Sequence, residues 1–273
     1  MRQRIVLTIR SVRLLLHVVR GVTTTAVILP WSSRKLRDRL IQNWAADLMR
    51  LLRVTVRIRG TLPERHHFPV VLTANHISWV DIFAIHSVYP VRFVSKSEVR
   101  HWPVFGWLAA KTGTLFLVRS SRKQTAAIGQ EMEDVLATGD SLGLFPESTT
   151  SEGMTVLPFR TSLLQAAINR ETVLLPVALR YRLEDERHNP HIPFIGEMTF
   201  ARSLARVLSS PPSLVEIRIG AIVTPNGRHR RDLALHLEQI TASLLSDASL
   251  PHHDANVFRR EPETGHGLPD APP

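Results

Sequence analysis

Short apolar stretches alternate with amphipathic stretches along the middle of the chain, and this alternation limits the fold more than any other feature. Strands are predicted where apolar, often β-branched residues are bounded by glycine, proline or polar residues. They cover residues 54–59, 69–74, 91–94, 115–118, 141–145, 173–179 and 214–219. Helices are predicted over 82–88, 124–137 and 161–169. Strands that alternate with helices in this way predict a layered α/β fold.

The N-terminal region is basic as well as apolar. Residues 5–29 contain too few consecutive apolar residues for a membrane-spanning helix, which needs about 20. Four basic residues interrupt the stretch: Arg10, Arg13, His17 and Arg20. We interpret it as a helix that lies on a membrane, with its arginines reaching anionic headgroups. An ordinary basic helix packed on the domain is the alternative. Residues 35–52 predict a second amphipathic helix.

Length and composition predict one α/β domain with additions at both ends. A chain of 273 residues that is 44% hydrophobic can bury one sizeable core. We expect membrane-associated helices over residues 1–52, the domain over 53–250 and a disordered tail over 251–273, which is rich in proline and charge. The chain has no cysteine, which excludes disulfides, thiolate metal sites and a cysteine nucleophile, and which suits a cytosolic setting.

The formal net charge of +10 predicts a surface that attracts anions. Aromatic residues are few, and no stretch alternates aromatic with basic residues as base-stacking surfaces do. We therefore expect an anionic membrane surface or phosphate-bearing small molecules as partners, and no nucleic acid.

The stretch from Thr73 to Asp81 carries the strongest indication of chemistry. It follows a predicted buried strand and enters a helix, which is where α/β sheets commonly build ligand sites. His76 and Asp81 are five residues apart and cannot share one face of a helix, so they can meet only if His76 precedes the helix. Ser78 would then be the N-cap, and Asp81 could orient His76 as a general base. The alternative is a simple capping box with no chemistry.

Four stretches in order resemble the motifs of the glycerolipid acyltransferase family. Asn75-His76-x4-Asp81 is similar to its first motif, whose histidine and aspartate form a catalytic dyad. Residues 113–119, 144–151 and 173–178 resemble the second, third and fourth motifs. The resemblance spans about residues 70 to 180. It implies a mixed sheet flanked by helices, and acyl transfer from acyl-CoA or acyl-carrier protein to a lysolipid hydroxyl, with no metal and no tightly bound cofactor.

The resemblance also assigns roles to individual residues. His76 and Asp81 would be catalytic, and Arg119 would help to hold an acceptor phosphate. The substrate-binding residues would be Asn75, Ser78, Arg119, Glu147, Ser148, Thr149 and Thr150. For Glu147, which has no obvious partner in the sequence, a role in positioning the site is expected.

The third motif departs from the family pattern at two positions, and this leaves two acceptors open. Ser148 replaces a glycine, so a backbone conformation with positive φ would cost more there. Thr150 replaces an arginine that would help to bind phosphate. The first acceptor is 1-acyl-sn-glycerol-3-phosphate, which would give phosphatidic acid. The second is a lyso-ornithine lipid, because similar variants resemble enzymes that act on that phosphate-free lipid. Either reaction is expected at the cytoplasmic face of the inner membrane.

Three other classes of protein compete with this interpretation. A serine hydrolase would need a nucleophile elbow with the pattern Gly-x-Ser-x-Gly, and we expect no such pattern. A metal enzyme is disfavoured because His-Glu-x-x-His is absent. A non-enzymatic basic adaptor for membrane surfaces would explain the charge but not the ordered motifs. If the chain is the acyltransferase, His76→Ala or Asp81→Asn should abolish transfer with little change in thermal stability.

Overall fold

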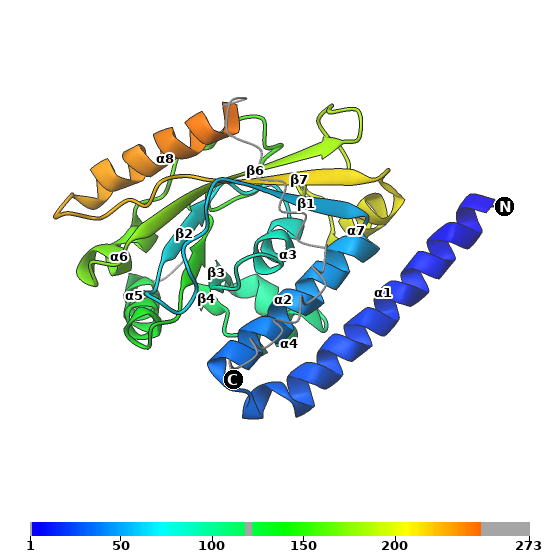
Figure 1. Cartoon of the computed structure of the whole chain (residues 1–273), viewed down its shortest axis with the longest axis horizontal. Helices are drawn as coiled ribbons and strands as arrows, with labels where there is room; N and C mark the ends of the chain where they lie inside the picture. The colour runs from blue at the N-terminus through cyan, green and yellow to red at the C-terminus, as the bar shows by residue number, and fades with distance from the viewer. Residues whose placement is uncertain (1, 118–121, 247–273) are drawn as a thin grey trace, which may run out of the picture.

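The computed structural model describes residues 2–117 and 122–246, which build one seven-stranded sheet between layers of helices (Figure 1). The strand order is β1-β7-β6-β2-β5-β3-β4. The strands are β1 (Val54–Arg59), β2 (Val71–Ala74), β3 (Arg92–Lys96), β4 (Leu115–Leu117), β5 (Leu142–Leu144), β6 (Leu174–Leu183) and β7 (Ser213–Ile219). Strands β6 and β7 pair antiparallel and the other neighbours pair parallel, so the sheet is mixed, as expected.

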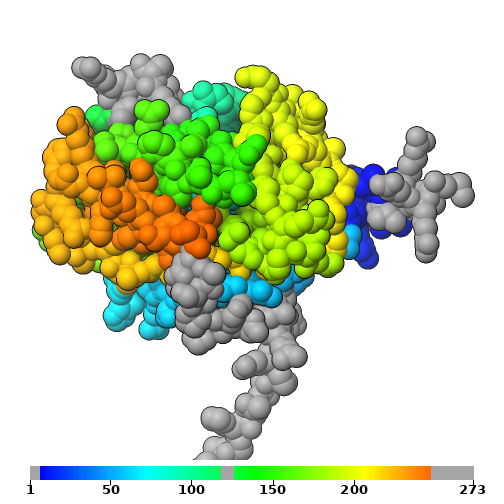
Figure 2. All heavy atoms as spheres, turned by 90° about the horizontal axis from the view of Figure 1, so that it is seen from above, coloured from blue at the N-terminus to red at the C-terminus, as the bar shows by residue number. Residues whose placement is uncertain are grey.

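Helices cover both faces of this sheet. They are α1 (Arg2–Val27), α2 (Arg34–Leu51), α3 (Val80–His86), α4 (Phe105–Lys111), α5 (Arg122–Ala137), α6 (Gln165–Asn169), α7 (Phe200–Ser209) and α8 (Arg230–Ser246). Three short 3-10 helices are η1 (Leu29–Trp31), η2 (Ser97–His101) and η3 (Ser162–Leu164). One hydrophobic core joins the sheet to α1, α2, α3 and α7, and a second joins the opposite face to α5, α6 and α8. Figure 2 looks onto the second face, where α8 lies in orange.

Helices α1 and α2 run side by side, and α2 belongs to the core. Ala45, Leu48 and Met49 of α2 are buried against the sheet layer. His17 of α1 and Trp44 of α2 form two hydrogen bonds, from Trp44 Nε1 to the His17 carbonyl and between His17 Nε2 and the Trp44 carbonyl, each 3.1 Å long. Their rings stack with centroids 4.6 Å apart. This pair fastens the N-terminal helix to the domain.

The arrangement of the strands places the motifs at one edge of the sheet. Strands β2, β5 and β6 are parallel, so the loops that follow β2 and β5 leave from the same edge. The first motif lies in the loop after β2, and the third lies in the loop after β5. Arg119 of the second motif and the tail over residues 251–273 lie outside the described residues.

Candidate active site

His76 and Asp81 are hydrogen-bonded in the loop between β2 and α3. The helix begins at Val80, so His76 precedes it, as the spacing requires. His76 Nδ1 lies 2.9 Å from Asp81 Oδ2. The same oxygen accepts hydrogen bonds from the backbone amides of Ile77, at 2.7 Å, and Ser78, at 2.9 Å. Asp81 thus folds the loop back over the first turn of α3 and is completely buried there.

Ser78 is not the side-chain cap that the sequence predicted. The N-cap position of α3 is Trp79, and no side chain caps the helix from outside. Within the described part of the chain, the buried hydroxyl of Ser78 has no hydrogen-bond partner. The physical reason is that Asp81 already binds the backbone amides of the loop from inside the helix, as the acidic residue of a capping box does.

The imidazole of His76 is held so that one nitrogen remains available. The ring stacks on Phe145, with centroids 4.0 Å apart and an angle of 13° between the planes. A carboxylate only accepts hydrogen bonds, so the contact with Asp81 favours the tautomer with its proton on Nδ1. The side chain of His76 is 20% exposed. Nε2 is therefore the atom that can meet a substrate.

Glu147 braces the loop that carries His76. Its buried carboxylate accepts hydrogen bonds from the backbone amides of His76, at 3.2 Å, and Leu157, at 3.0 Å. The amide of Ser151 donates to the His76 carbonyl at 2.8 Å. Burial raises the pKa of Glu147 to about 7; the charges of Asp81 and Glu238 add to the rise, and the two amide bonds oppose it. This geometry supports the positioning role expected for Glu147.

Glu147→Gln should change how stability depends on pH. The pKa of this carboxyl is about 7 when folded and 4.5 by reference, so the folded chain holds an extra proton between these values. Stability from this group is present below the lower value and is lost as pH rises through the higher one, by about 3 kcal/mol in total. As pH rises from about 5 to about 7.5, the free energy of unfolding measured in urea should therefore fall less in Glu147→Gln than in the parent. The exposed Glu184→Gln is the matched control. Equal pH dependence in parent and Glu147→Gln would refute the assignment.

Asn75 joins two strands instead of facing an open site. Its Nδ2 donates to the Leu179 carbonyl at 3.1 Å, and the Leu179 amide donates to its Oδ1 at 2.7 Å. The side chain is fully buried. Asn75 therefore fixes the end of β2 against β6, and its predicted contact with substrate stays a prediction.

The two unusual residues of the third motif, Ser148 and Thr150, each have a structural consequence. Ser148 adopts a φ of 63°, the conformation that the usual glycine would favour. The hydroxyl of Thr150 donates to the Phe194 carbonyl, and the Phe194 amide donates to the Ile77 carbonyl at 2.9 Å. Thr150 therefore ties the third motif to the loop of His76. Thr149 is exposed, and its predicted role in binding substrate stays a prediction.

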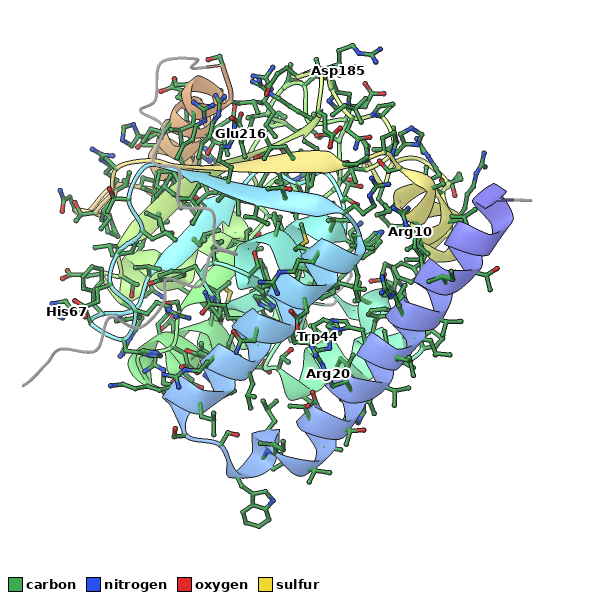
Figure 3. The ribbon with its side chains drawn as sticks, turned by 45° about the vertical axis from the view of Figure 1, so that its right-hand side comes forward. Arg10, Arg20, Trp44, His67, Asp185 and Glu216 are labelled. Atoms are coloured by element: carbon green, nitrogen blue, oxygen red, sulfur yellow. The ribbon has the colours of Figure 1, made fainter. Side chains whose placement is uncertain are left out.

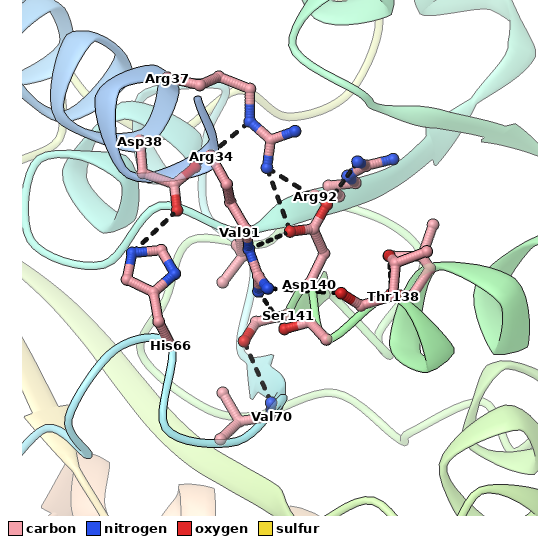
Figure 4. A network of polar contacts seen from close by, with 12 residues as sticks. Arg34, Arg37, Asp38, His66, Val70, Val91, Arg92, Thr138, Asp140 and Ser141 are labelled. Atoms are coloured by element: carbon pink, nitrogen blue, oxygen red, sulfur yellow. Dashed lines mark hydrogen bonds and ion pairs between the residues drawn. The ribbon is translucent and has the colours of Figure 1, made fainter. Parts of the chain in front are cut away.

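One expectation from the sequence is wrong: a Gly-x-Ser-x-Gly pattern does occur, from Gly139 to Gly143. Ser141 precedes β5, whereas a nucleophile elbow follows a strand. Its Oγ accepts a hydrogen bond from the Val70 amide at 3.1 Å. Next to it, Asp140 binds three arginines that join α2 and β3 to this loop: Arg34, Arg37 and Arg92 (Figure 4). The pattern is structural and lies at the edge of the sheet opposite His76.

An apolar cavity of about 120 Å³ lies beside the site, between the N-terminal helices and the sheet. Its wall includes the aromatic side chains Trp44, Trp79, Phe83, Phe93, Phe105 and Phe200. Phe93 stacks on Phe145, which in turn stacks on His76. Two stacked aromatic rings, Phe93 and Phe145, therefore connect the wall of the cavity to the imidazole of His76.

Tyr181 is a site residue that sequence reasoning missed. It lies on β6, and its hydroxyl donates to Asp81 Oδ1 at 2.8 Å. Because 100 residues separate the two, no local spacing reveals the contact.

Known proteins resemble this chain in sequence and in fold. Residues 53–180 match the acyltransferase family. A lyso-ornithine lipid O-acyltransferase from Pseudomonas aeruginosa is 35% identical over 254 residues, which cover 91% of this chain and 96% of that protein. A 1-acyl-sn-glycerol-3-phosphate acyltransferase from Neisseria meningitidis is 34% identical over 173 residues, 63% of this chain and 67% of the relative. The structure of the 1-acyl-sn-glycerophosphate acyltransferase PlsC from Thermotoga maritima, 22% identical, superposes with a TM-score of 0.61 and covers 86% of this chain and 96% of that chain. This last likeness confirms the α/β fold.

Proposed function

Because the chain belongs to the acyltransferase family, we propose that it moves a fatty acyl group from an acyl thioester to the hydroxyl of a lysolipid. The observation that carries this proposal is the His76–Asp81 pair, which leaves Nε2 available beside an apolar cavity. The donor would be acyl-CoA or acyl-carrier protein, and no tightly bound cofactor is needed.

The proposed reaction is a direct transfer. His76 Nε2 takes the proton from the acceptor hydroxyl, and Asp81 stabilises the resulting imidazolium. The acceptor oxygen attacks the thioester carbonyl carbon and forms the new C–O bond. The C–S bond then breaks, and the departing thiolate takes the proton back from His76. No covalent acyl-enzyme forms.

The apolar cavity would hold the acyl chain. Its aromatic and aliphatic lining offers the apolar surface that a hydrocarbon chain favours over water. Phe93 and Phe145 connect its wall to His76, so a chain bound there would bring its thioester toward the imidazole.

Two acceptors have support, and we place lyso-ornithine lipid first. The relative from Pseudomonas aeruginosa that bears this activity in its name matches nearly the full length of both chains. Thr150 lies in the position of the usual phosphate-binding arginine, and its hydroxyl donates a hydrogen bond to the Phe194 carbonyl. 1-Acyl-sn-glycerol-3-phosphate is the second candidate, supported by the relative from Neisseria meningitidis and by the resemblance of the second motif, which includes Arg119.

The test is acyl transfer by the purified protein from a labelled long-chain acyl thioester, with both lysolipids offered side by side. Product from lyso-ornithine lipid alone would support the first acceptor, and product from lysophosphatidic acid alone the second. Release of free fatty acid with neither lysolipid acylated would refute transfer. His76→Ala protein is the blank in every arm.

We also propose that α1 lies on the cytoplasmic face of the inner membrane. Exposed apolar residues recur along this helix at helical spacing: Ile9, Val12, Leu16, Val19 and Val27. Trp31, just after the helix, is 89% exposed, which suits an aromatic anchor at a bilayer surface. Of the helices in the described residues, none is long and apolar enough to cross a membrane.

A basic groove between α1 and α2 supports an anionic membrane partner. It has a volume of about 810 Å³ and is lined by five arginines: Arg10, Arg13, Arg20, Arg50 and Arg53. Asp47 is the one acidic residue among its lining residues. Burial and the nearby charge of Arg53 lower the pKa of Arg10, so an anion in the groove would relieve repulsion. Figure 3 shows Arg20 and Trp44 between the two helices.

Arg53→Gly should separate membrane binding from stability. Arg53 follows the end of α2 with a φ of 59°, where glycine would relieve about 1 kcal/mol of backbone strain. Thermal stability should therefore rise. Binding to anionic vesicles should weaken about fivefold, the effect of roughly 1 kcal/mol per basic residue. Arg228→Gly, in an exposed loop before α8, is the control for lost charge. Higher stability with unchanged vesicle binding would exclude this groove from the membrane contact.

A further inference from the structure

The pairing of β6 with β2 holds Tyr181 beside Asp81. Strand β6 lies next to β2. The two hydrogen bonds between the Asn75 side chain and the Leu179 backbone hold the end of β2 against β6. Tyr181 is two residues beyond Leu179 on the same strand, so the two side chains point to the same face of the sheet. Its hydroxyl reaches Asp81 Oδ1 at 2.8 Å, and its side chain is 1% exposed.

The two oxygens of Asp81 have unequal surroundings. Oδ2 receives His76 Nδ1 and the amides of Ile77 and Ser78. Among the hydrogen bonds found in the described residues, Oδ1 receives only that of Tyr181. The tyrosine hydroxyl thus opposes rotation of the carboxylate about its Cβ–Cγ bond. Without it, Oδ1 would be a fully buried carboxylate oxygen with no donor, a costly arrangement.

We propose that Tyr181 is a positioning residue for acyl transfer, which holds the Asp81 carboxylate so that Oδ2 keeps the proton of His76 on Nδ1 and leaves Nε2 free to take the acceptor's proton. The inference rests on the proposed function. Burial, together with the charge of Asp81, raises the pKa of Tyr181 well above its usual value, so the hydroxyl remains a donor at every pH at which the enzyme would work.

The chain provides a matched control, because it has only two tyrosines. Tyr89 is 2% exposed, and burial raises its pKa as well. Its hydroxyl bonds to Ser141, at the opposite edge of the sheet from His76. Tyr89→Phe therefore removes a buried tyrosine hydroxyl of the same kind without touching the dyad.

The first test compares the steady-state kinetics of Tyr181→Phe and Tyr89→Phe. Loss of one hydrogen bond to a charged group predicts a fall in kcat of about 10-fold or more for Tyr181→Phe, with KM for both substrates unchanged. Tyr89→Phe should keep kcat within about twofold of the parent. Equal losses of kcat in the two variants, or a kcat for Tyr181→Phe within about twofold of the parent, would overturn the proposal.

A second test does not depend on activity. In ¹⁵N spectra of histidine-labelled protein, the signals of His76 are those missing from His76→Ala. The parent should show one tautomer, with Nδ1 protonated, whereas Tyr181→Phe should show a mixture and Tyr89→Phe should match the parent. Unchanged nitrogen shifts in Tyr181→Phe would refute the positioning role. Absence of transfer by a parent that shows the single tautomer would count against the proposed function instead.

Discussion

Replacing His76 with alanine should lower kcat about 10²- to 10⁴-fold, the range for loss of a general base. The imidazole is the group that we propose takes the proton of the acceptor hydroxyl through its Nε2. Folding should change less than in Asp81→Asn, because the backbone bonds of His76 to Glu147 and Ser151 remain and the amides of Ile77 and Ser78 still bind Asp81. The measurement is the initial rate of transfer at saturating thioester and lysolipid.

Vesicle binding and the control variant His67→Ala complete this experiment. His67 lies on an exposed loop before β2 (Figure 3), whereas His76 follows the other end of that strand. Both His67→Ala and the parent should transfer at the same rate, and all three proteins should bind anionic vesicles alike. A loss of less than about tenfold in His76→Ala would mean that another group takes the proton.

Asp81→Asn should lower kcat by a similar factor, about 10²- to 10⁴-fold, and should also destabilise the fold. Asparagine keeps the shape of the side chain, and the Tyr181 hydroxyl can turn to accept from its NH₂ group. The remaining oxygen would still accept from His76, Ile77 and Ser78, but without the negative charge that strengthens those bonds.

The expected cost is about 2 kcal/mol of unfolding free energy, measured by urea denaturation. From the sequence we expected little change in stability, because spacing alone did not show that Asp81 holds two backbone amides in a fully buried position. Asp185→Asn, on the exposed surface, is the control. If Asp81→Asn unfolded at the same urea concentration as the parent, these amide bonds would contribute nothing measurable.

The strands were predictable because their patterns are local. Strand β1 matches its predicted range, since residues 54–59 alternate and end before Gly60. Helices α4, α7 and α8 were not predicted. The apolar residues of α7 recur at helical spacing, as do those that α8 buries, so both helices carry a pattern that indicates a helix. Helix α4 is short, and η2 comes so close that a side chain at Gly106 would lie 2.2 Å from the Arg100 carbonyl oxygen. The stability of α4 comes from tertiary contacts, which the pattern of a single segment does not contain.

The candidate site was predictable only where its residues are neighbours in sequence. The spacing of His76 and Asp81 allows their contact and the family resemblance predicted it, and the positive φ of Ser148 agrees with the glycine usual at that position. The stacking of Phe145 on His76 and the bond from Tyr181 to Asp81 bring together distant segments. The resemblance places Asn75 among the substrate-binding residues, which stays a prediction, and no local pattern showed that its amide pairs with β6.

A double-mutant cycle of His76→Ala and Asp81→Asn tests the central claim most directly. Single-turnover transfer from a labelled acyl thioester to lyso-ornithine lipid or lysophosphatidic acid would be measured for the parent, both single variants and the double variant. Because Asp81 is proposed to act only through His76, the double variant should be no slower than His76→Ala alone. If the double variant were slower by the product of the two single losses, the residues would act independently, and the dyad would be contradicted.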